Sequence, residues 1–332
     1  MKKPVIGITM GDPAGIGPEI IVKALVSESM TGRCSCIVFG DSRILQMALA
    51  ITKTPASLHV IHDISDAVFL PGSIEVMDFA NVDPDQFHFG RVDAQCGRAA
   101  YEYIEKAIFC AMDGQLDAIA TAPINKESIH AANVPYIGHT EIFGSLTGTA
   151  DPLTMFETNN LRIFFFTRHL SLRDMLDRIK KEPLKDFART CRDALHRLGI
   201  QEGTMAVAGL NPHCGEHGLF GDEEIREIAP AVEELRSEGM DIQGPIGADS
   251  VFHQAAMGRF NCVLSLYHDQ GHIAAKTLDF DRTISVTNGM PILRTSVDHG
   301  TAFDIAGKNM AGEISMIEAI LIAAKYAPYY TR

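Results

Sequence analysis

Short apolar, β-branched runs alternate with longer amphipathic stretches along this sequence, and this alternation constrains the fold more than any other feature. It is typical of a parallel sheet with helices on both faces. We therefore expect an α/β protein with a largely parallel central sheet flanked by helices. Strands are expected over residues 5–9, 36–40, 58–61, 74–78, 118–122, 162–167, 205–210, 262–267 and 283–287. Helices are expected over residues 17–28, 43–51, 95–112, 184–198, 222–238 and 313–326.

Length and composition limit the classes of protein that remain. The 332 residues exceed the roughly 250–300 at which a single hydrophobic core stops growing, so we expect two domains, although no Pro- or Ser-rich linker marks a boundary. The 42 acidic residues outnumber the 29 basic ones, and this excess disfavours nucleic acid or an anionic membrane surface as a partner.

The sequence also predicts a cytoplasmic protein. Residues 316–324 form the longest lipid-like stretch, which is shorter than the roughly 20 residues of a membrane helix and contains Glu318. The first apolar run ends at residues 11–13 without a small-residue cleavage site. The seven scattered cysteines are typical of reduced, mostly buried thiols, since the close pair Cys34 and Cys36 lacks the CxxC spacing.

Three expected strands end in the same way, with a histidine just beyond the strand. These residues are His169, His213 and His268. Ligands bind at the carboxyl ends of strands in open α/β sheets, and imidazoles held by rigid strands suit a catalytic divalent metal. A local zinc cluster of His213, Cys214 and His217 is an alternative that lacks an evident fourth ligand.

Basic and hydroxyl side chains in mixed-apolar surroundings predict capture of an anion such as phosphate or carboxylate. The candidates are Lys126, His139, Thr140, Lys276 and Arg294. The run GDPAGIGPE at residues 11–19 predicts a strand–helix elbow, but its glycine spacing is not the GxGxxG of a Rossmann fold.

Several motifs, taken in order, resemble those of the 4-hydroxythreonine-4-phosphate dehydrogenase (PdxA-like) family nearly end to end. They are ITMGDPAGIGPE at 8–19, GHTE at 138–141, NPH at 211–213, YHDQG at 267–271 and RTSVDHGTA at 294–302. The resemblance implies the two-domain fold of the isocitrate and isopropylmalate dehydrogenases rather than a Rossmann fold. It implies a cofactor-side domain of residues 1–122 plus 283–332, and a metal, substrate and dimer-interface domain of residues 123–282.

The resemblance further implies NAD-dependent oxidation of a secondary alcohol followed by β-decarboxylation, in a homodimer whose active site is shared between subunits. One divalent ion (Zn, Mg, Mn or Co) would be bound per site by His169 and His213 of one subunit and His268 of the other. The substrate-binding residues would be His139, Thr140, Lys276, Ser285 and Arg294. The groups that transfer protons would come from Lys276, Asp269 and Asp249. The adenosine-binding loop would contain His299, Gly300, Thr301, Ala302 and Asp304.

Two positions depart from the biosynthetic pattern of the family. Ser285 stands where an asparagine is expected among the substrate ligands, and His272 stands where an apolar residue is expected. Both changes favour a C2 hydroxyl over a C2 amine, hence D-threonate 4-phosphate or D-erythronate 4-phosphate over 4-hydroxy-L-threonine 4-phosphate. From the residues alone, a metal-dependent phosphatase or hydrolase and a catalytically silent sugar-phosphate binding protein stay open.

Overall fold

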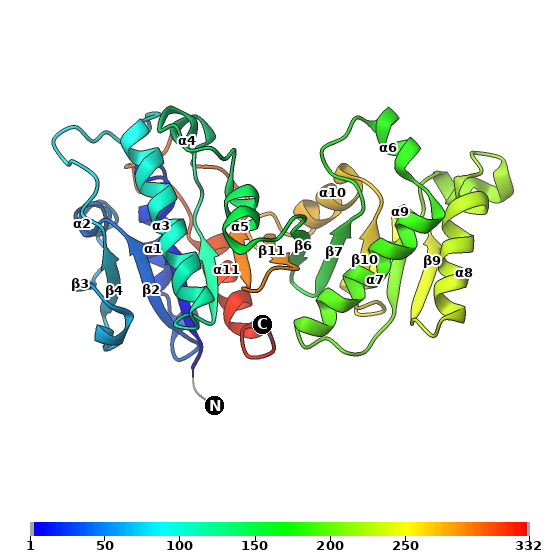
Figure 1. The fold of residues 1–332 in the computed structure, drawn as a ribbon, viewed down its shortest axis with the longest axis horizontal. Coiled ribbons are helices and arrows are strands. Elements are labelled where there is room, and N and C mark those ends of the chain that lie inside the picture. Colours follow the sequence, from blue (N-terminus) through cyan, green and yellow to red (C-terminus); the bar gives the residue numbers. More distant parts are fainter. Residues whose placement is uncertain (1–2, 331–332) are drawn as a thin grey trace. The chain divides into compact units, whose positions relative to one another are not determined.

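The computed structural model describes residues 3–330 and divides the chain into two compact units. Of these residues, the first unit comprises 3–152 and 284–330, and the second comprises 153–283. Each unit is an α/β layer structure with its own run of paired strands and its own helices (Figure 1).

The sheet of the first unit has the strand order β3-β4-β2-β1-β5-β12-β11. All neighbouring strands in it are parallel except β11 and β12, which pair antiparallel. The central strand β1 is buried from Ile6 to Thr9, as expected for a strand covered on both faces. Its strands are β1 (Val5–Thr9), β2 (Ser35–Gly40), β3 (Ser57–Ile61), β4 (Ser73–Asp78), β5 (Ala118–Thr121), β11 (Ile284–Asn288) and β12 (Arg294–Val297).

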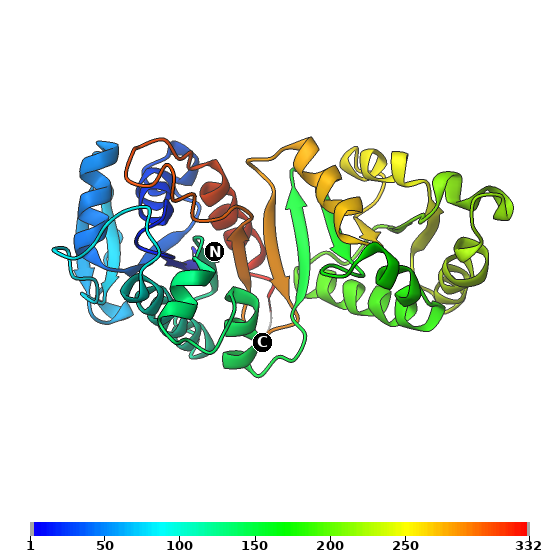
Figure 2. The same ribbon diagram turned by 90° about the horizontal axis from the view of Figure 1, so that it is seen from above.

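Helices cover both faces of this sheet. Figure 2 shows α1 and α11 packed together on one face, and α3 with α4 and α5 on the other. The helix starts follow local sequence rules: Pro18 occupies the first turn of α1, and the Asp93 and Asn125 side chains cap α3 and α4 by accepting backbone N–H groups. The helices are α1 (Gly17–Leu25), α2 (Ser42–Thr52), α3 (Ala94–Met112), α4 (Lys126–Ala131), α5 (His139–Thr147) and α11 (Ile314–Tyr326).

The second unit has the strand order β6-β7-β10-β8-β9. Here β7, β10, β8 and β9 are parallel, and β6 pairs antiparallel with β7. The strands are β6 (Leu153–Thr158), β7 (Leu161–Phe165), β8 (Met205–Ala208), β9 (Ile242–Ile246) and β10 (Cys262–Ser265). The helices are α6 (Leu172–Arg178), α7 (Lys181–Arg197), α8 (Ala229–Ser237), α9 (Ala248–Ala256) and α10 (His268–Leu278).

The structure confirms the α/β class with a largely parallel sheet flanked by helices, and it adds strands that the sequence analysis missed. These are β6, β9 and β12. Pro245 and Gly244 made β9 resemble a turn, but an edge strand tolerates proline because one side of its ladder is unpaired. Buried β12 reads as polar because it begins with Arg294 and contains Thr295 and Ser296.

One domain boundary differs from the expected one. Residues 123–152 belong to the first unit, whereas the boundary near residue 283 agrees to within one residue. Helix α4 packs against α3 through Ile129 and Ala100, and Tyr136 stacks on Tyr101 with ring centroids 6.0 Å apart. These contacts join side chains that lie far apart in the sequence. The assignment of residues 123–152 to the first unit therefore could not be inferred from local composition.

Among residues 3–330, the model contains no helix with the length and apolar character needed to cross a bilayer.

The contact between α3 and α4 generates a prediction. A Cβ on Gly97 would lie 2.0 Å from the Ser128 carbonyl oxygen and 2.7 Å from the Ile129 nitrogen, both backbone atoms. We expect Gly97→Ala to lower the free energy of unfolding by at least about 2 kcal/mol, because a rigid backbone must move. Urea unfolding followed by circular dichroism measures this loss.

Gly312→Ala is the matched control, since a Cβ there meets nothing within 4 Å. An unchanged unfolding midpoint for Gly97→Ala would contradict the close approach of α3 and α4.

Candidate active site

The three histidines predicted to bind metal follow three adjacent parallel strands of the second unit. His169 lies beyond β7, His268 beyond β10 at the start of α10, and His213 beyond β8, with β10 between the other two strands. Parallel strands present their carboxyl ends at one edge of a sheet, so the histidines are delivered to the same edge.

Two of these histidines share a pocket. The rings of His169 and His268 have centroids 6.2 Å apart and line a pocket of about 300 Å³ together with Arg168, Tyr267 and Asp269. The His268 Nδ1 donates to the Asp269 carboxylate at 2.6 Å. In a neutral imidazole, that bond leaves Nε2 as the nitrogen with a lone pair, which is the orientation a metal ligand needs.

His272 lies against the same histidine from one turn further along α10. Its ring stacks on that of His268 at 3.6 Å with an interplanar angle of 13°, and its Nδ1 donates to the His268 carbonyl oxygen at 2.8 Å. Its other ring contacts are with Phe156 and Phe165, each at 4.4 Å. The unexpected histidine of the sequence therefore packs directly on a predicted metal ligand.

His213 lies outside this pocket. It is exposed on a turn with positive φ angles that runs from His213 to His217. Across residues 3–330, no three His, Cys, Asp or Glu side chains of one chain are arranged to bind a metal ion. This holds both for the three strand-end histidines and for the alternative cluster of His213, Cys214 and His217.

The predicted acid and base residues of the second unit occupy different elements. Asp269 lies in the His268 pocket, and Lys276 is half-buried on α10, with its Nζ 5.5 Å from the centroid of the Phe280 ring. Asp249 is exposed in the first turn of α9. The pKa of the Cys214 thiol is raised mainly by burial and then by the negative charges of Glu224 and Asp249. Asp249 therefore lies near the turn that contains His213.

In the first unit, a buried cation forms the core of the predicted anion site. Arg294 is 5% exposed and donates to the hydroxyls of Thr121 and Thr287, and no carboxylate of the described residues pairs with it. Burial lowers the pKa of this guanidinium to about 9. A buried cation held by neutral hydroxyls alone is costly, and a bound anion would compensate it.

His139 stands beside that cation at the start of α5. Burial and the Arg294 charge lower its pKa well below the ordinary value, so the imidazole is neutral. Its buried Nε2 has no hydrogen-bond partner among the described residues. Thr140 follows in the same turn and is exposed, and Ser285 is half-buried in β11. Arg294, His139 and an open hydroxyl together suit a phosphate or carboxylate.

A second buried polar residue of this unit was not predicted from the sequence. Asn288, at the end of β11, is fully buried, and neither side-chain polar atom has a partner in residues 3–330. It lies between Lys276 and Arg294 in the sequence, three positions after Ser285. Its burial could not be inferred from the pattern, because the residue precedes Gly289 and resembles part of a turn.

The loop predicted to bind adenosine is attached to α1. The Thr301 carbonyl accepts from the Ile16 N–H at 3.1 Å, and the buried Glu19 carboxylate accepts from Gly307 and Asn309 at 2.6 and 2.8 Å. Glu19 belongs to the GDPAGIGPE motif, but this role was not predicted from the sequence. His299 and Ala302 are half-buried, Thr301 is buried, and Gly300 and Asp304 are exposed.

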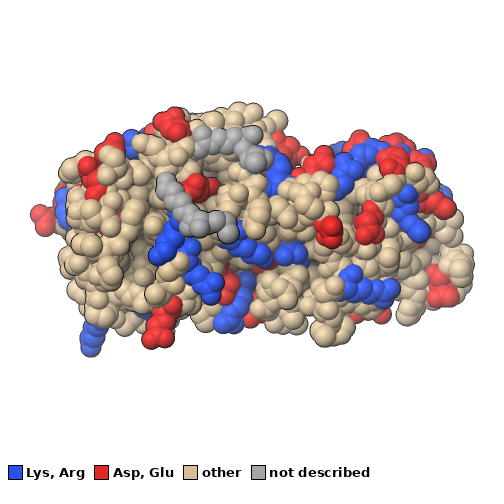
Figure 3. Space-filling view, turned by 90° about the horizontal axis from the view of Figure 1, so that it is seen from below, with Lys and Arg blue, Asp and Glu red and all other residues tan. Residues whose placement is uncertain are grey.

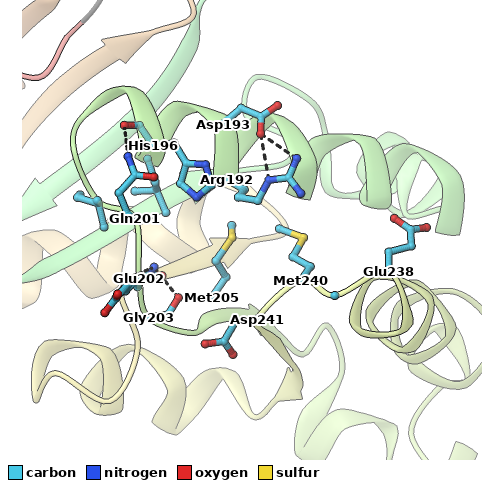
Figure 4. A pocket seen from close by; sticks show the side chains of 14 residues that line it. Arg192, Asp193, His196, Gln201, Glu202, Gly203, Met205, Glu238, Met240 and Asp241 are labelled. Atoms are coloured by element: carbon cyan, nitrogen blue, oxygen red, sulfur yellow. Dashed lines mark hydrogen bonds and ion pairs between the residues drawn. The ribbon is translucent and has the colours of Figure 1, made fainter.

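A larger pocket of the second unit has none of the predicted residues. It measures about 610 Å³ and lies at the amino ends of the strands, beside Met205 and Asp241 (Figure 4). Its cation Arg192 is paired with Asp193 at 2.8 Å. This is the opposite edge of the sheet from the histidines.

On the face shown in Figure 3, basic and acidic side chains are interspersed.

Comparison with known proteins assigns nearly the whole chain to one family. Residues 32–323 match the family model described as "Pyridoxal phosphate biosynthetic protein PdxA". A protein of Clostridium botulinum is 55% identical over 331 residues, covering 100% of this chain and 99% of the relative. A protein of Fusobacterium nucleatum is 57% identical over 325 residues, covering 98% of each. Both carry the name "Putative D-threonate 4-phosphate dehydrogenase".

A solved structure is similar along the same length. The 4-hydroxythreonine-4-phosphate dehydrogenase of Klebsiella pneumoniae is 43% identical, with a TM-score of 0.88 over 98% of this chain and 100% of that one.

The buried guanidinium generates a prediction. We expect Arg294→Met to raise the free energy of unfolding by about 1 kcal/mol at pH 7, because it removes a desolvated charge without a counter-ion. The same substitution should abolish the rise in melting temperature that inorganic phosphate gives the wild type. Thermal unfolding with and without phosphate measures both effects. Retained stabilisation by phosphate in the variant would contradict the assignment of Arg294.

Proposed function

Because this chain belongs to the PdxA family, we propose that it is an NAD-dependent dehydrogenase that oxidises and decarboxylates a 4-phosphorylated hydroxy acid. The proposed substrate is D-threonate 4-phosphate or its epimer D-erythronate 4-phosphate. Oxidation of the C3 hydroxyl sends a hydride to NAD and a proton to a base. Loss of C1 as CO2 and protonation of C2 then give dihydroxyacetone phosphate.

The observation that carries the proposal is the buried Arg294 beside neutral His139. Arg294 donates to the hydroxyls of Thr121 and Thr287, and its remaining N–H groups can donate to an anion from outside the protein. The proposal assigns the substrate phosphate to Arg294, His139 and Thr140, with Lys276 and Ser285 completing substrate recognition. The names of the Clostridium and Fusobacterium relatives support the same class of substrate.

The strand-end histidines of the second unit are suitable ligands for a divalent metal, and the hydrogen bond of His268 favours the tautomer that a ligand needs. His268 is oriented by Asp269 and shares a pocket with His169, and both present imidazole nitrogens. The proposed set takes His169 and His213 from one subunit and His268 from a second subunit. A bound divalent ion would lower the pKa of the substrate hydroxyl and stabilise the enolate formed on decarboxylation.

The protein groups hold and move the protons. The Asp269 carboxylate keeps the proton of His268 on Nδ1, which fixes the ring in one orientation. Lys276 or Asp269 would accept the C3 hydroxyl proton and return a proton to C2 after CO2 leaves, with Asp249 as a further acid near the His213 turn. His139 is neutral, so its single ring N–H can donate a hydrogen bond to the substrate anion.

The cofactor loop fits a dinucleotide. Glu19 holds its far end through two backbone N–H groups, and a Cβ on Gly300 would meet no protein atom within 4 Å. A backbone with that much open space allows close approach of a nucleotide. We assign adenosine binding to His299, Gly300, Thr301, Ala302 and Asp304.

A homodimer is part of the proposal because the predicted ligand set is incomplete in one chain. Large apolar side chains next to the histidines are exposed, which is typical of surfaces covered by a partner. Leu172 and Ile273 are 66% and 64% exposed, and Leu219, near the His213 turn, is 72% exposed.

The alternative substrate is 4-hydroxy-L-threonine 4-phosphate, and the name of the Klebsiella structure favours it. The two substrates differ at C2, where one has a hydroxyl and the other an amine. We assign the preference for the hydroxyl to Ser285 and to His272, whose ring stacks on His268.

The substrates can be separated by one assay. With NAD and added divalent metal, we expect NADH formation from D-threonate or D-erythronate 4-phosphate to exceed that from 4-hydroxy-L-threonine 4-phosphate by at least about tenfold in kcat/KM, roughly 1.4 kcal/mol of discrimination. A chelator should abolish the reaction, and restored metal should recover it.

His272→Leu is the specificity variant, with Leu278→Ala, an exposed site on the same helix, as its control. Faster turnover of the amino substrate by the wild type would overturn the assignment to sugar-acid phosphates. Release of inorganic phosphate without NADH would instead identify a hydrolase.

A further inference from the structure

The turn that contains His213 has an unusual backbone. Five consecutive residues, His213 to His217, have positive φ angles between 41° and 79°, with ψ between −4° and 60°. Only Gly215 among them is a glycine. L-residues with a Cβ adopt this left-handed conformation at a cost in free energy, and they do so as single residues far more often than in series.

One buried carboxylate holds the start of this turn. Glu224 is 2% exposed, and its Oε1 accepts from the backbone N–H groups of Leu210 and Asn211 at 2.8 and 2.7 Å. Its Oε2 accepts from Asn211 Nδ2 at 2.9 Å. Three N–H donors compensate the buried charge and fix the two residues that lead from β8 into the turn.

The middle of the turn also lies against this carboxylate. A Cβ on Gly215 would lie 3.1 Å from Glu224 Oε2 and 2.5 Å from the Gly221 carbonyl oxygen, so only glycine fits there. Glu224 itself begins a π-helical turn, Glu224–Ile228, ahead of α8. Such turns are rare and occur frequently at functional sites.

We infer that Glu224 is a positioning residue that holds the left-handed turn and thereby sets the direction in which His213 presents its imidazole. This inference rests on the proposed function, in which His213 is a metal ligand. Residues that orient a ligand from behind govern metal affinity as well as geometry. An exposed turn of ordinary handedness would need neither the backbone cost nor a buried carboxylate.

The test uses the full chain and Co²⁺ alone as the probe, with absorption titration for affinity and thermal unfolding for stability. Glu224→Gln replaces one acceptor oxygen with an N–H₂ group that faces donors. We expect it to weaken Co²⁺ binding by about 10- to 100-fold. Loss of kcat should exceed any change in KM for the phosphorylated substrate.

Glu227→Gln is the matched control. It makes the same charge change in the same π-helical turn, but Glu227 bonds Lys180 and Lys181 instead of the left-handed turn. We expect wild-type affinity and kcat from it. If Glu224→Gln does not fold, Asn211→Ala takes its place, because that change removes one of the three donors that hold the Glu224 carboxylate against the start of the turn. It also removes the 2.7 Å bond from Asn211 Nδ2 to Glu223, and weaker Co²⁺ binding is expected.

A second variant separates positioning from general stability. Glu216 is exposed with φ 41°, and Glu216→Gly removes the cost of a left-handed residue, so it should raise the melting temperature. Added to Glu224→Gln, it should recover stability while Co²⁺ affinity stays low.

Failure of the positioning role of Glu224 can be distinguished from failure of the proposed function. Wild-type Co²⁺ affinity in Glu224→Gln or Asn211→Ala, or affinity restored together with stability in the double variant, would overturn the positioning role while the wild type still turns over. A wild type that neither binds Co²⁺ nor forms NADH would overturn the proposed function and the inference with it.

Discussion

The parallel pairing of β7, β10 and β8 is the constraint on which the chemistry of the second unit depends. Because these strands run in one direction, the residues that follow them emerge at a single edge, and each is followed by a histidine. The sheet provides the spacing, but it does not orient the side chains. Local contacts do so: Asp269 and His272 fix the ring of His268, and Glu224 fixes the turn that contains His213.

Three buried charges, Glu19, Glu224 and Arg294, form the second theme of the structure. Glu19 and Glu224 are both nearly inaccessible, and both use their oxygens to accept backbone N–H groups of a loop at the edge of a sheet. Arg294 differs, because it donates to the neutral hydroxyls of Thr121 and Thr287. In this account the first two charges are satisfied inside the protein, and the third is satisfied by the substrate, so that stability is lower until the substrate binds.

Much of the fold could be predicted from the sequence, since buried parallel strands are continuous apolar runs. Strand β1 was predicted at its observed bounds, and α3 to within one residue. Strand β12 was missed because Arg294 and its neighbours are polar residues in a buried strand, and β9 is a short edge strand that contains a glycine and a proline. The candidate residues came from strand ends and from a family resemblance. Glu224, Glu19 and Asn288 could not be found in that way, because their roles depend on contacts with backbone far away or on burial that no periodicity reveals.

The central claim is that a functional metal site needs histidines from two subunits, and mixing two inactive variants tests it most directly. His213→Ala and His268→Ala should each be inactive as purified homodimers. Unfolded together in equal amounts and refolded, they should recover about a quarter of wild-type NADH formation, because half of the dimers are mixed and each has one intact site of two. Activity that stays at the background of the separate variants, while wild type treated in the same way refolds, would contradict a site shared between subunits.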